Sequence, residues 1–279
     1  MGTGRKRGRG TGMKIRIVTG ILTGAVCLAG FSENVFQEKT PAGGLYKFEN
    51  EFNWSTQSLT DPGLWFLTGT ATVDQQSGKL TVDPQDEKGG LFIGRQGKNG
   101  SLNVTGGSLK ILSNVILGHN GGAGTLNLSA GEIFIGGNLS GPAGKEIRLS
   151  GGTLQVEGTI NSQVSEFRYT GGVIRCEHFG ISSGVFDIRI GPKTTPVDVK
   201  RSLFGSGVLT LSLQDGYEPL AGQEIVLFTF TSDDKMAWTD GQGGGWQDGK
   251  TLHFGGKAFT VVRKKDRLSV IPQPVTVVG

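Results

Sequence analysis

The chain has 279 residues, of which 49 are glycine and only 9 are proline, and its formal net charge is +4. There is no Gly-x-y period, so this composition excludes a collagen-like triple helix and favours a fold with many tight corners. Six of the 28 basic residues precede residue 30, where no acidic residue lies, which leaves 22 bases against 24 acids. Because the rest of the chain has no cationic excess to bind phosphate groups, we expect no nucleic-acid partner.

Residues 1–29 have the pattern of a secretory signal peptide, with translation starting at Met13. A short basic stretch follows Met13, and then come an apolar run of about a dozen residues and the small residue Ala29. This run is shorter than the roughly 20 apolar residues of a membrane-spanning helix, so we expect no transmembrane helix in the mature chain. A disordered basic tail on a cytosolic protein is the alternative, and Ser32 is a second candidate cleavage position. The pattern favours a protein that is secreted or displayed on the cell surface.

The middle of the chain repeats a unit of 24 residues. Residues 91–114 align without a gap on residues 115–138, with glycines, apolar residues and asparagines in matching positions. Related half-repeats follow at 147–156 and 167–176, and a degenerate copy precedes the block at 77–82. A unit of this length that repeats in register indicates a solenoid, in which each unit packs on its neighbours.

Each unit contains three short apolar-x-apolar pieces, such as Leu91-x-Ile93, separated by glycine-rich corners. Such pieces predict short strands with one buried face. Three strands and three corners predict one coil of a right-handed parallel β-helix, with about four to five coils of 20–24 residues over 91–190. A β-sandwich with glycine turns is the alternative, but in that fold the equal length of successive repeat units would have no structural cause.

The alignment also predicts which side chains stack in the interior. Cys176 takes the position of Val156, so its thiol is expected to point inward and to be inert. Asn103 and Asn127 are equivalent outward positions, and we expect them to hydrogen-bond along the stack. Two interior columns are expected, one of Leu102, Leu126, Ile147 and Phe167, and one of Leu109, Ile133, Leu154 and Ile174.

The segments on either side of the repeats are expected to close the two ends of the solenoid. Residues 30–90 are predicted to form an N-terminal β region with an aromatic cap of Phe48, Phe52, Trp54, Trp65 and Phe66. Alternatively, the aromatic residues form a sugar-binding platform, and the candidates for sugar contact are then Trp54, Trp65 and Trp246. Residues 191–271 are expected to form a small antiparallel β module, with strands at 208–213, 225–230, 258–262 and 267–271.

The repeat unit resembles a known group of proteins. At 100–107 and 124–131 it reads Gly-Ser/Thr-Leu-Asn-Val/Leu-Thr/Ser, followed by a small residue and glycine. This unit is similar to repeats of secreted bacterial proteins of the autotransporter-passenger and PEP-CTERM types. The segment 209–223 and the strand after it resemble the closing module of such proteins. The resemblance implies a β-helical, exported protein and says little about activity.

The last residues, 272–279, resemble a degenerate PEP-like sorting tail. Its motif residues are Pro272, Gln273 and Pro274. Gln273 stands where the family has glutamate, and the family's apolar helix and arginine cluster do not follow it. The resemblance therefore implies a protein that is released or whose anchor has been truncated.

Many parallel β-helices degrade polysaccharides, which requires carboxylates that converge on neighbouring coils. The acidic residues of the repeats are expected to occupy different positions of the coil and not to stack: Glu132, Glu146, Glu157 and Glu166. His119 lies in a Gly-x-x-Gly corner that is equivalent to residues 94–97, which indicates an exposed turn residue. The acidic stretch 83–87 is a weak candidate for calcium, because it lacks the alternating ligand spacing of a dedicated loop. We therefore expect no catalytic residue, no cofactor and no metal site.

The sequence thus predicts a non-catalytic secreted or cell-surface protein with a structural or adhesive role. Its expected partners are extracellular polysaccharide or other components of the cell envelope. The alternative is a polysaccharide-binding or polysaccharide-degrading protein built on the same scaffold.

Overall fold

Strands joined by glycine-rich turns make up the described part of the chain, which is all-β as the sequence predicts. The computed structural model describes residues 32–36, 48, 63–82, 90–141 and 146–274, all within the unit Phe31–Gly279. In these residues the one helical element is a 3-10 turn, η2 (Gln75–Ser77), whose first N–H groups are capped by the Asp74 carboxylate. The same residues contain no helix with the length and apolar character needed to cross a membrane.

Several expectations fall on residues that are not described. These are the export signal at 1–29, the aromatic residues Phe52 and Trp54, and the acidic stretch at 83–87.

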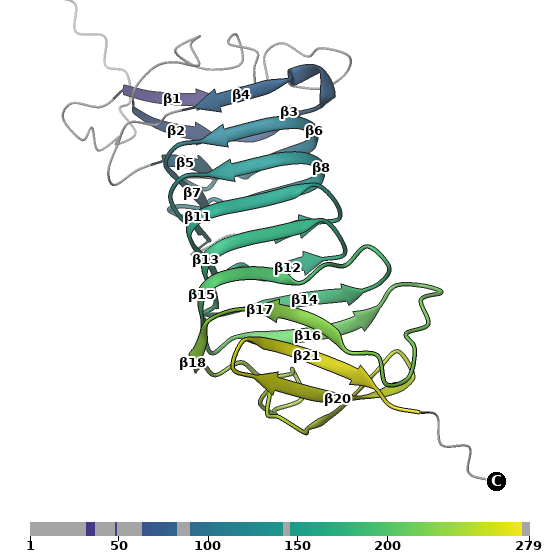
Figure 1. Cartoon of the computed structure of the whole chain (residues 1–279). Helices are drawn as coiled ribbons and strands as arrows, with labels where there is room; N and C mark the ends of the chain where they lie inside the picture. Colours follow the sequence, from purple (N-terminus) through teal and green to yellow (C-terminus); the bar gives the residue numbers. More distant parts are fainter. Residues whose placement is uncertain (1–31, 37–47, 49–62, 83–89, 142–145, 275–279) are drawn as a thin grey trace, which may run out of the picture. The chain divides into compact units, whose positions relative to one another are not determined.

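The strands of the described residues belong to one mixed sheet of 21 strands, most of which pair in parallel in three ladders (Figure 1). The first ladder joins β1 (Ser32–Phe36), β2 (Gly63–Leu67), β5 (Gly90–Ile93), β7 (Asn114–Leu117), β9 (Leu139–Ser140), the later parts of β11 (Thr153–Ser162), β13 (Val173–Ile181) and β15 (Val197–Gly205), and β18 (Ser232–Met236). The second ladder joins β3 (Gly69–Val73), the first parts of β6 (Gly100–Ile111) and β8 (Gly124–Ile135), then β10 (Glu146–Leu149), β12 (Glu166–Tyr169), β14 (Val185–Ile190) and β16 (Val208–Leu213).

The third ladder begins in parallel and ends in antiparallel pairs. It joins β4 (Lys79–Val82), the later parts of β6 and β8, the first parts of β11, β13 and β15, and β17 (Ile225–Thr229). Three antiparallel strands follow β17 in the order β21 (Arg267–Pro272), β20 (Lys257–Lys264) and β19 (Thr251–Phe254). We use the word rung for one strand of a ladder.

The register of the ladders confirms the predicted stacking of apolar residues. In the second ladder the paired residues run Ala71, Leu102, Leu126, Ile147, Phe167, Phe186 and Leu209, and each is at most 2% exposed. In the third ladder Leu109, Ile133, Leu154 and Ile174 pair in the same way. Cys176 pairs with Val156, and both side chains are buried. The two columns of the core therefore lie where the sequence alignment predicts them.

A column of glycines turns the corner between the second and third ladders. Gly107, Gly131, Gly152 and Gly172 all have positive φ, which L residues other than glycine rarely adopt. A Cβ on Gly131 would lie 2.5 Å from the backbone oxygen of Gly107, and a Cβ on Gly152 would lie 2.6 Å from that of Gly131. Glycine is required at this corner both for the backbone angle and for the close approach of successive rungs.

The C-terminal part differs from expectation in where the antiparallel strands begin. We expected antiparallel strands from residue 191, but β15 pairs in parallel with β13 and β16 pairs in parallel with β14. The antiparallel pairs begin only at β17. The expectation for 197–213 was wrong because Phe186 and Leu209 continue the interior column although the glycine spacing of the repeat has been lost.

Aromatic side chains fill the interior near these last parallel rungs. Phe179 and Phe228 have ring centroids 5.5 Å apart, and Trp238 lies 6.1 Å from Phe179 and 5.2 Å from Phe228. The Trp238 indole N–H donates to the backbone oxygen of Phe204 at 2.7 Å, which satisfies its one polar group. This cluster was not predicted, because we expected an aromatic cap at the N-terminal end.

Candidate functional site

The candidate sugar-contact residues that the structure describes are buried. Trp65 is fully buried next to Leu91 in the first ladder, and Trp246 is 3% exposed. An indole binds a sugar by stacking one ring face on it, but Trp65 has no accessible surface and Trp246 reaches only the lining of a pocket. Trp54, the third candidate, lies outside the described residues.

The residues of the PEP-like motif belong largely to the sheet. Pro272 is buried at the end of β21, opposite Phe259. The Gln273 backbone N–H donates to the oxygen of Ala258 at 2.8 Å, and its side-chain Nε2 donates to Thr260 Oγ1 at 2.6 Å. Pro274 is exposed.

Asparagine side chains link successive rungs outside the core. Asn127 Nδ2 donates to Asn103 Oδ1 at 2.7 Å, which confirms the predicted outward pair. A second series was not predicted: Asn114 Oδ1 accepts the Asn138 backbone N–H, and Asn138 Oδ1 accepts the Thr159 backbone N–H, both at 2.8 Å. The matching of Asn114 with Asn138 in the repeat was the sequence signal that could have revealed this series.

The expectation that the acidic residues do not stack was wrong for one pair. Glu146 and Glu166 are register partners on β10 and β12, and Arg148 and Arg168 are register partners two residues further on. Arg148 is ion-paired with Glu146 on its own strand, and Arg168 Nε donates to Glu166 at 3.1 Å. Because Glu166 accepts this hydrogen bond, the pKa of Arg168 is raised, with smaller effects from nearby carboxylates. Both carboxylates thus already face a cation, and the four residues form a partly exposed charge grid in which two glutamates stack beside two stacked arginines.

The corner that contains His119 covers outward aromatic rings. Phe66 and Phe92 lie 5.1 Å apart, the His119 ring lies 5.1 Å from Phe92, and the Arg95 guanidinium lies 3.6 Å from the centre of the Phe66 ring. Partial burial lowers the pKa of His119, and the charge of Arg95 lowers it further. His119 therefore lies in the corner as expected, but it is partly buried against Phe92 and not exposed, and its imidazole is neutral at neutral pH.

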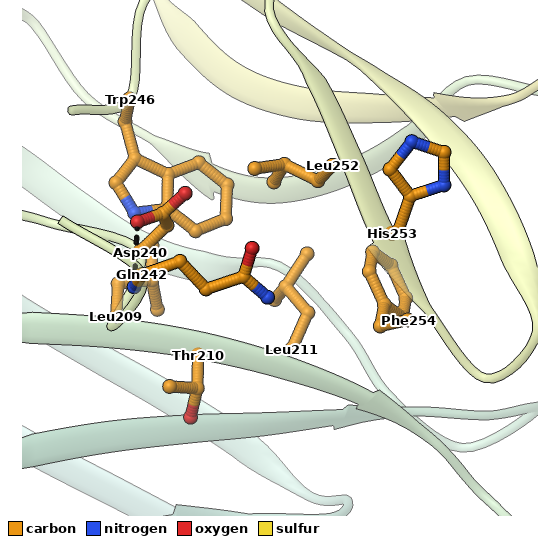
Figure 2. A pocket seen from close by; sticks show the side chains of 9 residues that line it. All are labelled: Leu209, Thr210, Leu211, Asp240, Gln242, Trp246, Leu252, His253 and Phe254. Carbon is orange, nitrogen blue, oxygen red and sulfur yellow. Dashed lines mark hydrogen bonds between the residues drawn. The ribbon is translucent and has the colours of Figure 1, made fainter. Parts of the chain in front are cut away.

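A pocket of about 210 Å³ lies between β16, β19 and the turn that carries Asp240 and Trp246 (Figure 2). It is lined by Leu209, Thr210, Leu211, Asp240, Gln242, Trp246, Leu252, His253 and Phe254. In Figure 2 the Gln242 side chain reaches from the Asp240 side of the pocket towards Leu211 and Leu252.

Asp240 fixes the turn that forms one wall of this pocket. Its Oδ2 accepts from Lys250 Nζ at 2.7 Å, and its Oδ1 accepts the backbone N–H groups of Gln242 and Gly244 at 2.9 and 3.0 Å. Burial on its own would raise the pKa of the Asp240 carboxyl, but these hydrogen bonds outweigh burial and the pKa is lowered. The carboxylate stays charged and is neutralised by Lys250, so it serves as a structural anchor.

The pocket was not predicted, because its walls come from segments that are distant in the sequence.

Among the described residues, no three His, Cys, Asp or Glu side chains are grouped so that they could hold a metal ion. A comparison of the chain with protein-family models, with curated proteins and with solved structures gave no match.

Proposed function

We propose that the chain is a non-catalytic, secreted or cell-surface structural protein. In this proposal a right-handed parallel β-helix acts as a rigid spacer, and its exposed corners make adhesive contact with polysaccharide or other cell-envelope components. The handedness follows the general rule for connections between parallel strands.

The continuity between successive rungs is the observation that carries the proposal. Leu126 and Ile147 stack in the core, while outside it Asn114 accepts from Asn138 and Asn138 accepts from Thr159 of β11. Because neighbouring rungs are joined here by apolar contacts and by side-chain hydrogen bonds, bending the stack would break both. This is the property required of a spacer.

The charged side chains on the outside of β10 and β12 are better suited to binding a partner than to catalysis. The charge grid of Glu146, Arg148, Glu166 and Arg168 has its carboxylates paired with guanidinium groups, so neither carboxylate is set up as a proton donor. Arginine and glutamate side chains at a regular spacing can instead bind a surface whose charges are complementary to theirs. Export is supported by the sequence pattern between Met13 and Ala29.

Export and adhesion can be tested with the chain expressed from Met13 in a Gram-negative host with a C-terminal epitope tag. We expect a shortened product outside the cytoplasm and increased attachment of host cells to surfaces coated with the purified protein. The control is a chain in which Ile21→Arg and Leu22→Arg interrupt the apolar run of the export signal. Retention of an uncleaved protein in the cytosol would contradict export.

A separate assay tests the non-catalytic part of the proposal. The purified protein is incubated with neutral and acidic polysaccharides, and reducing ends and unsaturated products are measured. We expect no release above a heat-denatured control. Sustained release from one polymer would replace the structural role with the polysaccharide-degrading alternative.

A further inference from the structure

The next rung of the second ladder begins and then stops. Beyond β16, Thr239 forms a parallel bridge with Val208, and the Thr239 N–H donates to the oxygen of Gly207 at 3.0 Å. The Leu209 N–H in turn donates to the oxygen of Thr239 at 2.9 Å. These bonds run along the outer edge of β16 as those of a further parallel strand would. The chain then turns away at Asp240, which is held by Lys250.

Among the described residues, no strand lies beside the remainder of this edge. In a parallel pair alternate residues bond to opposite sides. The N–H groups of Val208 and Gln214 donate to Gly184 and Ile190 on the β14 side, so those of Leu211 and Leu213 face the outer edge. Within the described residues, β16 forms a ladder with β14 only, and no backbone partner is found for Leu211 or Leu213 on that edge.

The pocket of about 210 Å³ borders this open edge. Leu211 belongs to β16, and the facing wall is formed by Leu252 and Phe254 of β19 and by Trp246 (Figure 2). Asp240, the acidic residue of the lining, is neutralised by Lys250. The space therefore combines strand-edge donors and acceptors with apolar walls and little net charge.

We propose that this edge of β16 binds an extended peptide segment of a partner protein, which adds as a parallel strand that continues the rung begun at Thr239. A peptide backbone presents N–H and C=O groups at the two-residue spacing that Leu211 and Leu213 require. Side chains that face the pocket would meet Leu211, Leu252 and Trp246, so the segment carries uncharged apolar residues at alternate positions. Because the segment continues an existing strand-to-strand ladder, its register is set by the bond between Leu209 and Thr239. This inference does not depend on the spacer role proposed above.

The test measures hydrogen exchange of individual amides in the full chain with and without a peptide. The probe is the capped peptide KVLTLSLK, which carries the sequence of β16 between two lysines. Without peptide, we expect the amides of Leu211 and Leu213 to exchange at least tenfold faster than those of Thr210 and Ser212, which face β14. Saturating peptide is expected to slow exchange at Leu211 and Leu213 by at least tenfold and to leave Thr210 and Ser212 unchanged.

Two controls separate strand addition from other binding. A peptide N-methylated at alternate residues on the edge facing β16 cannot donate to it, and we expect it to give no protection. Gln242→Trp should fill the pocket and abolish protection, whereas Gln247→Trp, at an exposed position outside the pocket, should not.

Three results would overturn the proposal. One is peptide binding without protection of Leu211 and Leu213, and another is equal protection in the two tryptophan variants. The third is protection without peptide that grows with protein concentration, which would assign the edge to a second copy of this chain.

Discussion

Asn138 repeats, one rung further on, the role that Asn114 plays: each side-chain oxygen accepts a backbone N–H of the next rung at 2.8 Å. The relay is independent of the apolar columns, because both side chains lie outside the core. Its contribution to stability can therefore be measured separately.

Replacement of Asn138 tests this relay. Asn138→Ala leaves the backbone N–H of Thr159 without its acceptor, and we expect the free energy of unfolding to fall by about 1 kcal/mol. Urea denaturation of the two proteins measures the difference. Asn99→Ala, at an exposed corner position, is the control and should change stability by less than about 0.5 kcal/mol. Equal effects of the two substitutions would contradict a specific role for the relay.

A matched pair of glycines separates backbone strain from crowding. Gly131 and Gly121 have φ of +82° and +81°, but a Cβ on Gly131 would lie 2.5 Å from Gly107 O, whereas on Gly121 the nearest atom is 3.9 Å away. We expect Gly121→Ala to cost about 1 kcal/mol from strain and Gly131→Ala to cost at least twice as much. Thermal and urea unfolding measure both losses. Similar losses would mean that successive rungs are less closely packed at this corner than the structure shows.

The Glu224 carboxylate is expected to contribute less to the stability of the fold in acid. Hydrogen bonds from Arg267 and then from Ser269 lower the pKa of the Glu224 carboxyl from 4.5 to about 2. Because the folded pKa lies below the ordinary value, this contribution is complete above about pH 4.5 and is lost as the pH falls towards 2. Urea midpoints of the native chain and of Glu224→Gln should therefore differ at pH 7 and converge near pH 2. A difference that does not change with pH would contradict this assignment.

Cys176 is expected to be unreactive until the protein unfolds. Burial raises the pKa of its thiol far above the ordinary range, and Val156 occupies the equivalent place one rung earlier. Alkylation followed by mass spectrometry should leave the Cys176 peptide unmodified in native buffer and label it fully in denaturant. Cys176→Val should retain the fold, with a stability change below about 1.5 kcal/mol. Rapid labelling of the native protein would contradict an inward thiol.

The sequence predicted the interior columns and the outward pair of Asn103 and Asn127, but not the pairing of the charged surface residues. Leu102 and Leu126 could be placed because the repeat aligns without a gap and strand alternation then fixes the buried face. The same alignment places Glu146 beside Glu166, since Ile147 pairs with Phe167, although the expectation assigned the two acidic residues to different positions of the coil. Because side chains alternate along a strand, one known pair of register partners assigns every other residue of the two strands to a face and to a partner.

The C-terminal end could be predicted only in part. The strands at 208–213 and 267–271 were visible as alternating residues, whereas their partners were not, because the repeat no longer sets the spacing there. The Asp240–Lys250 ion pair that shapes the pocket depends on how the turn folds back, and neither residue carries a pattern of its own. Contacts of this kind arise from the three-dimensional path of the chain.

Thr125 pairs with Glu146 after 21 residues and Glu166 pairs with Val185 after 19, yet the apolar column beside them is not interrupted. The corners absorb every change in length, so insertions at an exposed corner such as Gln96–Lys98 would leave the stacked interior in place. The exposed corners of such a chain can therefore change in sequence and length while the buried columns stay the same, and other loops could be grafted at these corners.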